Sequence, residues 1–325
     1  MGYTNWSDTA YESRQDQRKR TKTSAFTYDA HVRSSGVRVV HPQMNPYGVT
    51  REIRDSVQHP NSVSIATIFD VTGSMGEVPR VLQTKLGKLM RMLTDKQLVT
   101  DPQLLFGAVG DAWCDAVPLQ IGQFESGLEM DDDLGKIFLE GGGGGQVYES
   151  YELAIYFAAR KLSMDCFEKR GRKGYLFTIG DEKPYAVVSH KQVNEWIGGE
   201  LTRDIPVQQI VGEALRKFEY FHIIPTNTAH GRSEDVQNTW RSLLGERVLM
   251  LDDEGAVCET IALAIGLCEG TFLNLNRATD EMVNAGYDAK AAKSAASALN
   301  RYTVVNSAGK GKAQKQLPPP VAIRI

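Results

Sequence analysis

The sequence predicts an α/β protein with a doubly wound, mostly parallel sheet and helices on both faces. Between residues 62 and 270, apolar strand-like runs alternate with amphipathic helical stretches, and this alternation is typical of parallel sheets. Several runs are continuously apolar and β-branched, as expected for strands covered on both sides. A chain of 325 residues with 42% hydrophobic residues is long enough to bury one large core.

Composition excludes several classes of function. The formal net charge of -3 is close to neutral, so the chain is not expected to bind nucleic acid or a membrane surface. No apolar run reaches the length of a membrane span, about 18 residues. The four cysteines are scattered without metal-ligand spacing, which favours free thiols in a reducing compartment. A cytoplasmic protein is therefore expected.

The first half of this region begins with a β-branched apolar stretch, 62-SVSIATIFD-70, which predicts a buried strand. Leucines spaced three and four apart then predict an amphipathic helix, with Pro79 in its first turn, where proline is tolerated. Further strands are expected at 103–112 and around the alternating residues 117–121. An acidic helical segment at 131–140 and five glycines follow.

The second half repeats the alternation of helix and strand. A helix is expected at 147–162, and the strand 174-GYLFTIGDE-182 ends in two acids. The remaining elements are expected as a helix near 206–218, a strand at 219–226, a helix containing Trp240 and Leu243, a strand at 246–251 and a helix at 255–270.

Four regions are predicted along the chain. Residues 1–61 are polar and poorly periodic, so an extended arm is expected, either disordered or laid along the body. Residues 62–270 form the α/β domain. Residues 271–305 form an Ala-rich helical extension, and 306–325 a polar linker with a proline-led tail.

The chemistry of the first strand end points to a metal ion. Asp70 ends the strand, and Thr72 and Ser74 follow in the loop that opens a helix. Ligands of doubly wound sheets bind at the carboxyl ends of the strands. One carboxylate and two hydroxyls supply the oxygen ligands that Mg²⁺ prefers, with Mn²⁺ or Ca²⁺ as alternatives. A helix cap made by the same residues is the structural alternative.

The segment 70-DVTGSM-75 resembles the Asp-x-Ser-x-Ser motif of von Willebrand factor A domains, known as the metal-ion-dependent adhesion site. The resemblance covers roughly residues 62–270 and implies a Rossmann-like sheet. It implies that Thr72 and Ser74 ligate the metal directly and that Asp70 holds its waters. The family takes a second aspartate from the end of the fourth strand, which places Asp181 in that role.

One part of the family pattern is missing. The family usually supplies a third hydroxyl from a Gly-Gly-Thr loop, but the loop here, 141-GGGGGQVYES-150, has no threonine. Either Glu149 or Ser150 takes its place, and the sequence does not decide between them. A ligating Glu149 would add negative charge and weaken attraction for an outside carboxylate. Asp111, at the end of the second strand, is a further candidate ligand or a turn aspartate.

The resemblance implies a metal-dependent protein-protein interaction module rather than an enzyme. A partner would present an Asp or Glu to the metal, and an AAA+ ATPase or another complex component is a possible partner. Two alternatives remain open. The arm and tail could drive self-association into a structural assembly, or Asp70 could be the nucleophile of an aspartyl-phosphate phosphotransferase or phosphatase.

Overall fold

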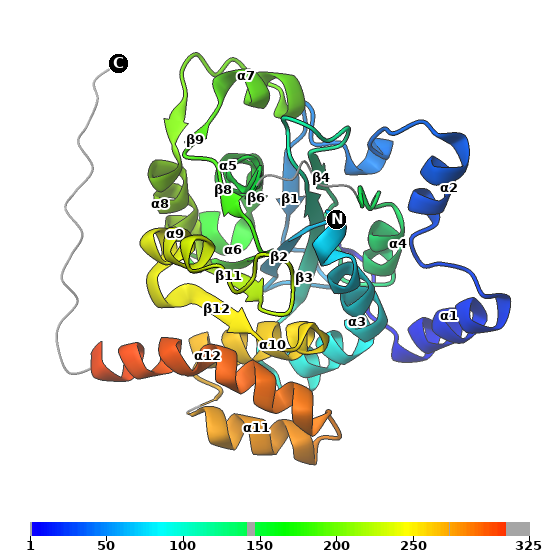
Figure 1. Cartoon of the computed structure of the whole chain (residues 1–325). Helices are drawn as coiled ribbons and strands as arrows, with labels where there is room; N and C mark the ends of the chain where they lie inside the picture. The colour runs from blue at the N-terminus through cyan, green and yellow to red at the C-terminus, as the bar shows by residue number, and fades with distance from the viewer. Residues whose placement is uncertain (1, 142–146, 273, 310–325) are drawn as a thin grey trace.

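A six-stranded sheet lies at the centre of the computed structural model (Figure 1). The structure describes residues 2–141, 147–272 and 274–309, without the side chains of residues 74 and 304–309. The strands, in the order β12-β11-β7-β2-β3-β4, are Val248–Leu251, Phe218–Pro225, Gly174–Ile179, Val63–Asp70, Pro102–Val109 and Leu119–Ile121. All neighbours are parallel except β3 and β4. The predicted fold class is confirmed.

Helices cover both faces of this sheet, because successive side chains of a strand point to opposite sides. In β2, Ile65 and Phe69 join one core, and Ala66 and Ile68 join the other. The first core includes side chains of helices α3, α10 and α12, which span Glu77–Asp95, Val257–Cys268 and Ala289–Gly309. The second includes those of α5, α8 and α9, which span Tyr151–Lys161, Val207–Lys217 and Glu234–Leu244.

Shorter elements connect and extend this core. In the described part of the chain, three two-stranded pairings lie outside the main sheet: β1 (Arg51–Ile53) with β6 (Leu162–Met164), β5 (Tyr148–Glu149) with β8 (Lys183–Pro184), and β9 (Val187–Val188) with β10 (Ile205–Pro206). The short helical elements are α4 (Glu129–Gly135), α6 (Asp165–Glu168), α7 (His190–Gln192), η1 (Pro42–Met44), η2 (Gly73–Met75), η3 (Val193–Ile197), η4 (Gly245–Arg247) and η5 (Glu254–Ala256).

The N-terminal segment is not the extended arm that its sequence predicts. It contains two helices, α1 (Asp8–Thr21) and α2 (Thr27–Ser35). Helix α1 buries only Tyr11, so it has no apolar stripe by which the sequence could reveal it. A Ser7 cap and the Arg18 ion pair with the buried carboxylate of Asp131 stabilise it against the body instead.

The C-terminal extension is helical, as predicted. Helix α11 (Leu275–Asn284) packs against α12, and α12 packs along α10 and β12. The proline-led tail at 310–325 lies outside the described residues, and the division of the chain into four regions stays a prediction. Among the residues that the structure describes, no helix combines the length and the apolar character needed to cross a membrane.

Candidate metal centre

Asp70 lies at the point where the winding of the sheet reverses. The chain runs from β2 outward to β3 and β4, then returns to β7 on the other side of β2. In doubly wound sheets the crevice at such a point, outside the carboxyl ends of the strands, is where ligands bind. Asp70 ends β2, and Asp181 and Glu182 follow the end of β7.

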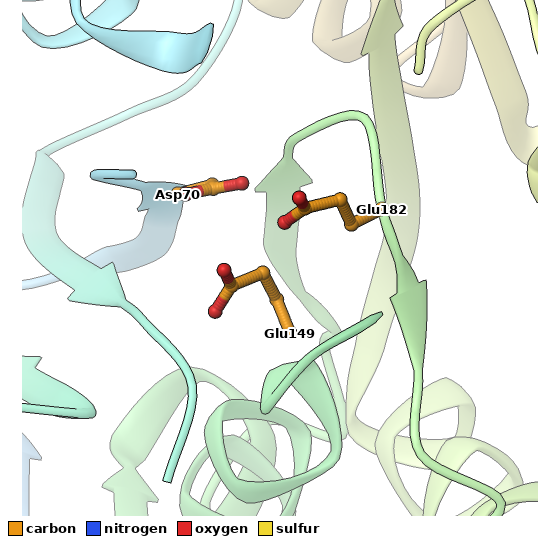
Figure 2. Close-up of side chains that lie close together, drawn as sticks. All are labelled: Asp70, Glu149 and Glu182. Carbon is orange, nitrogen blue, oxygen red and sulfur yellow. The ribbon is translucent and has the colours of Figure 1, made fainter. Parts of the chain in front are cut away.

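Three carboxylates meet at this edge. One carboxylate oxygen from each of Asp70, Glu149 and Glu182 lies within 4.8 Å of the other two. Figure 2 shows the three side chains pointing toward one shared space, from three different segments of the chain. Their exposed fractions are 0%, 3% and 7%. Such a grouping has the geometry of a cation site.

The described residues do not neutralise the negative charge of the three carboxylates. Oε2 of Glu149 and Oε2 of Glu182 are buried without a hydrogen-bond partner among the described residues. The nearby Lys183 pairs with Asp235 instead. Burial raises the pKa of all three carboxyl groups above their ordinary range, and repulsion between neighbouring carboxylates adds to it. Buried carboxylates without partners are costly, so the arrangement favours a bound cation.

Asp70 is held in place by two neighbours. The backbone N–H and the hydroxyl of Thr72 both donate to Oδ1 of Asp70, each at 2.7 Å. The hydroxyl of Tyr151 donates to Oδ2 at 3.3 Å. Direct metal ligation by Thr72 stays a prediction, and the predicted ligand side chain of Ser74 lies outside what the structure describes.

Glu149, not Ser150, lies beside Asp70. Residues 148 and 149 form β5, which pairs with β8, so the predicted helix at 147–162 begins only at Tyr151. The parallel pairing sets Glu149 next to Pro184, close to Glu182. The hydroxyl of Ser150 instead accepts from the backbone N–H of Ala112 and donates to Asp111.

Of the two acids that follow β7, Glu182 joins the cluster, and the sequence had not singled it out. The predicted role of Asp181 as a metal-site aspartate stays a prediction. Asp181 is fully buried nearby and accepts a hydrogen bond from the backbone N–H of His230 at 2.8 Å. Two adjacent acids after a strand are visible in the sequence, but the approach of Glu182 to Glu149 accompanies the β5–β8 pairing, which no local pattern encodes.

Gly180 allows the strand end to approach its neighbours closely. A Cβ atom on Gly180 would lie 1.6 Å from the hydroxyl oxygen of Tyr151 and 3.0 Å from Cβ of Asp70. The ring of Tyr151 also packs edge-on against Trp240, and Trp240 stacks on the buried ring of His222. The indole N–H of Trp240 donates to the carbonyl oxygen of Glu182 at 2.8 Å. These aromatic rings therefore position two sides of the cluster.

Asp111 lies outside the three-carboxylate cluster. Its carboxylate accepts hydrogen bonds from the hydroxyl of Tyr185, at 3.0 and 3.1 Å, and from the backbone N–H of Trp113. This pattern fits the turn aspartate of the two predicted alternatives, and a supporting role for the metal stays a prediction.

Two aromatic residues, Tyr148 and Tyr185, belong to the segments that carry Glu149 and Glu182. Tyr148 precedes Glu149, and its ring stacks on Tyr185 at a centroid distance of 5.2 Å. Trp113, 66% exposed, lies 6.3 Å from Tyr185 between ring centroids. We call Trp113, Tyr148 and Tyr185 the aromatic rim. The glycine loop predicted to approach this edge falls largely on residues 142–146, which lie outside the described residues.

Comparison with known proteins assigns no family to the chain. No family model matches, and no curated protein matches. Among solved structures, the pilus adhesin SpaC from Lactobacillus rhamnosus GG in its open conformation is 11% identical over 68% of this chain, with a TM-score of 0.45. A second SpaC structure is 10% identical over 68% of this chain, with a TM-score of 0.42. The chain spans 31% and 32% of these two adhesin chains.

A third similar structure is an aerotolerance-related membrane protein from Bacteroides fragilis NCTC 9343. It is 11% identical over 62% of this chain and 98% of its own, with a TM-score of 0.36. TM-scores below 0.5 at this identity assign neither family nor function, so the functional argument rests on the geometry of the site.

Proposed function

We propose that the chain is a divalent-cation-dependent binding module of the von Willebrand factor A type. Its cation is held by Asp70, Glu149 and Glu182, with Thr72 and Ser74 as further oxygen ligands. The observation that carries this proposal is the meeting of three buried carboxylates, two of them with an unpartnered oxygen, at the winding reversal of the sheet.

The donor set fits a hard divalent cation. All candidate ligand atoms are oxygens, which Mg²⁺ and Ca²⁺ prefer over nitrogen and sulfur. A bound cation would also remove the cost of the buried, unpartnered oxygens of Glu149 and Glu182. The Asp-x-Thr-x-Ser spacing at the end of the first strand of the sheet supports the von Willebrand factor A type.

The charge of the ligand set limits what the bound cation can recognise. Three ionised carboxylates carry about -3 against +2 for the cation, so the filled site keeps a net negative charge. A partner's Asp or Glu is then repelled unless one glutamate is protonated. We therefore propose a partner that offers a neutral oxygen, such as a hydroxyl or a backbone carbonyl, in place of the carboxylate expected from the family.

The aromatic rim is the proposed contact surface for this partner. Trp113 and Tyr148 are the exposed members, and Tyr148 adjoins the ligand Glu149 in the chain. Aromatic side chains are enriched where proteins bind one another, because they bury much area at low entropic cost. An AAA+ ATPase remains one possible partner of this module.

Calorimetric titration tests the metal site directly. Mg²⁺, Mn²⁺ and Ca²⁺ are titrated into the wild type and into the variants Asp70→Asn, Glu149→Gln and Glu182→Gln. We expect one saturable site in the wild type and at least about tenfold weaker binding in each variant. The control is Glu77→Gln, an exposed acid in the first turn of α3, which leaves affinity unchanged. A wild type that binds none of the three ions would refute the proposal.

A phosphotransferase function centred on Asp70 has less support. Both carboxylate oxygens of Asp70 already accept hydrogen bonds, from Thr72 and Tyr151. Glu149 and Glu182 would also repel an incoming phosphate. Labelling of Asp70 by a phosphate donor would favour this alternative over a binding module.

A further inference from the structure

A second site lies away from the metal centre, at the β4 edge of the sheet. A cavity of about 180 Å³ lies between the segment 38–46, the loop before β4 and Trp196 of η3. Its walls are mostly apolar, from Val39, Val40, Pro46, Val117, Leu119 and Trp196. We call it the Trp196 pocket. Val39, on its wall, is 51% exposed.

Trp196, one of the residues that line the pocket, has an unpaired hydrogen-bond donor, while several backbone carbonyls of the lining residues are occupied. The indole N–H of Trp196 is buried without an acceptor among the described residues. The carbonyl oxygen of Val39 already accepts from Tyr28, and those of Asn45 and Pro118 accept from Arg51 and Gly110. A buried, unpartnered N–H is rare in folded proteins, so this one calls for a ligand that brings an acceptor.

A proline-rich segment has the matching chemistry. Proline offers an apolar ring and a carbonyl acceptor but no N–H donor. Grooves that recognise proline-rich segments are lined by aromatic side chains. The sequence of this chain contains such a segment, 317-LPPPVAIRI-325, beyond the described residues.

The distance from the end of α12 favours a neighbouring copy as the source of the segment. Helix α12 packs on β12 and the pocket is lined by Leu119 of β4, and these strands are the two opposite edges of the sheet. Six strands spaced about 4.8 Å apart span about 24 Å. The three prolines lie nine to eleven residues after Gly309 and reach at most about 31–38 Å when the chain is fully extended, while the path must also pass around the helices that cover the sheet. Figure 1 shows α12 along the bottom and α7, just before η3, at the top.

We propose that the Trp196 pocket binds the proline-led segment Leu317–Ile325 of a second copy of this chain, with Trp196 donating to a prolyl carbonyl. The contact joins the pocket of one copy to the tail of the next, so it is heterologous and can continue into chains or close into rings. It does not depend on the metal site.

Sedimentation of the full chain from about 1 µM to about 200 µM tests the proposal. We expect the mass of the wild type to rise with concentration. Trp196→Phe, which keeps an aromatic ring but removes the N–H, should weaken association about tenfold. Val39→Arg should abolish it by filling the pocket entrance. Val57→Arg is the matched control, because Val57 is 94% exposed and lies outside the pocket, and it should associate like the wild type.

Mixing two variants identifies the contact itself. Val39→Arg has a blocked pocket and an intact tail, and Pro318→Ser/Pro319→Ser/Pro320→Ser has the reverse. Each alone should stay monomeric, and the mixture should form a dimer through one intact pocket and one intact tail. A wild type that stays monomeric overturns the proposal, and so does equal loss of association in Val39→Arg and Val57→Arg. Binding of the tail within one monomer would also appear as a monomeric wild type and overturn it.

Discussion

Glu149 and Glu182 change the chemistry of a site that the sequence describes mainly by hydroxyls. The motif around Asp70 offers one carboxylate and two hydroxyls, which would leave a cation partly unneutralised. The folded chain adds two glutamates within 4.8 Å of that carboxylate. Glu149 and Glu182 lie 79 and 112 positions after Asp70 in the sequence. No local motif connects them to Asp70. At the residue scale, therefore, the proposed ligand preference is set by the tertiary neighbours of Asp70.

Glu149→Gln is expected to have opposite effects with and without metal. In the metal-free protein at about pH 8, the change removes a carboxyl group that burial and its acidic neighbours keep protonated, at a cost in stability, and it should raise the free energy of unfolding by about 1–3 kcal/mol. In saturating Mg²⁺ it should lower that free energy relative to the wild type, because a ligand is lost. Urea unfolding with chelator and with metal measures both.

The exposed Glu77→Gln provides the control for this pair of measurements and should show neither effect. A Glu149 variant that destabilises the protein equally in chelator and in metal would mean that the side chain has only a structural role.

Gly180→Ala should be strongly destabilising. The new Cβ would lie 1.6 Å from the hydroxyl oxygen of Tyr151, which is itself fully buried, so the strand end or the tyrosine must move. We expect a loss of about 2–4 kcal/mol in the free energy of unfolding, measured by urea titration. Gly212→Ala is the matched control, since no atom lies within 4 Å of its added Cβ in α8, and it should stabilise by about 0.5–1 kcal/mol.

At the scale of elements, helix α1 is attached to the body by charge more than by apolar contact. Asp131 of α4 is fully buried and accepts from Arg18 at 2.7 and 2.9 Å, from Arg14 and from Gln83. Breaking one side of a buried ion pair leaves an uncompensated charge. The attachment of α1 should therefore depend on these arginines.

Arg18→Met tests that attachment. We expect the free energy of unfolding to fall by about 2–4 kcal/mol and amide exchange in residues 8–21 to accelerate, because Asp131 loses its two-bond partner. Arg20 is an exposed arginine on the same helix. Arg20→Met should change the free energy of unfolding by no more than about 0.5 kcal/mol and should leave amide exchange in residues 8–21 unchanged. Unchanged exchange in Arg18→Met would show that other contacts hold α1.

At the scale of the whole molecule, the cluster should make stability depend on pH in a direction that metal reverses. Burial raises the pKa of Asp70, Glu149 and Glu182 in the folded chain above the value of about 4 in the unfolded chain. The folded state then binds more protons, so this contribution is complete below about pH 4 and is lost as pH rises through the folded pKa values. A bound metal requires ionised ligands, so with metal stability should rise with pH.

The measurement compares the wild type with Glu149→Gln/Glu182→Gln between about pH 5 and about pH 8. The difference between the two proteins isolates the cluster from His222, whose pKa burial lowers well below its ordinary value and which acts in the opposite direction. In chelator, the wild type should lose stability relative to the variant as pH rises. A difference that does not change with pH would contradict the raised pKa values.

The sequence by itself determined the fold class and the position of one residue of the candidate site, Asp70. Continuous apolar runs, helical stripes and their alternation depend on local side-chain periodicity, and the strands β2, β3, β7, β11 and β12 lie where these patterns predict them. The position of Asp70 follows from the same logic, because an acid directly after a parallel strand lies at the ligand-binding edge.

Only the tertiary structure decided which other acids meet Asp70 and how the N-terminal segment folds. Glu149, rather than Ser150, meets Asp70, and Glu182 joins them, where β5 pairs with β8. Helix α1 forms against Asp131, whose carboxylate lies 113 residues from Arg18 in the chain. Contacts between distant segments leave no periodic signal in either segment, so local patterns place the strands and one aspartate but cannot reveal the partners that complete the site.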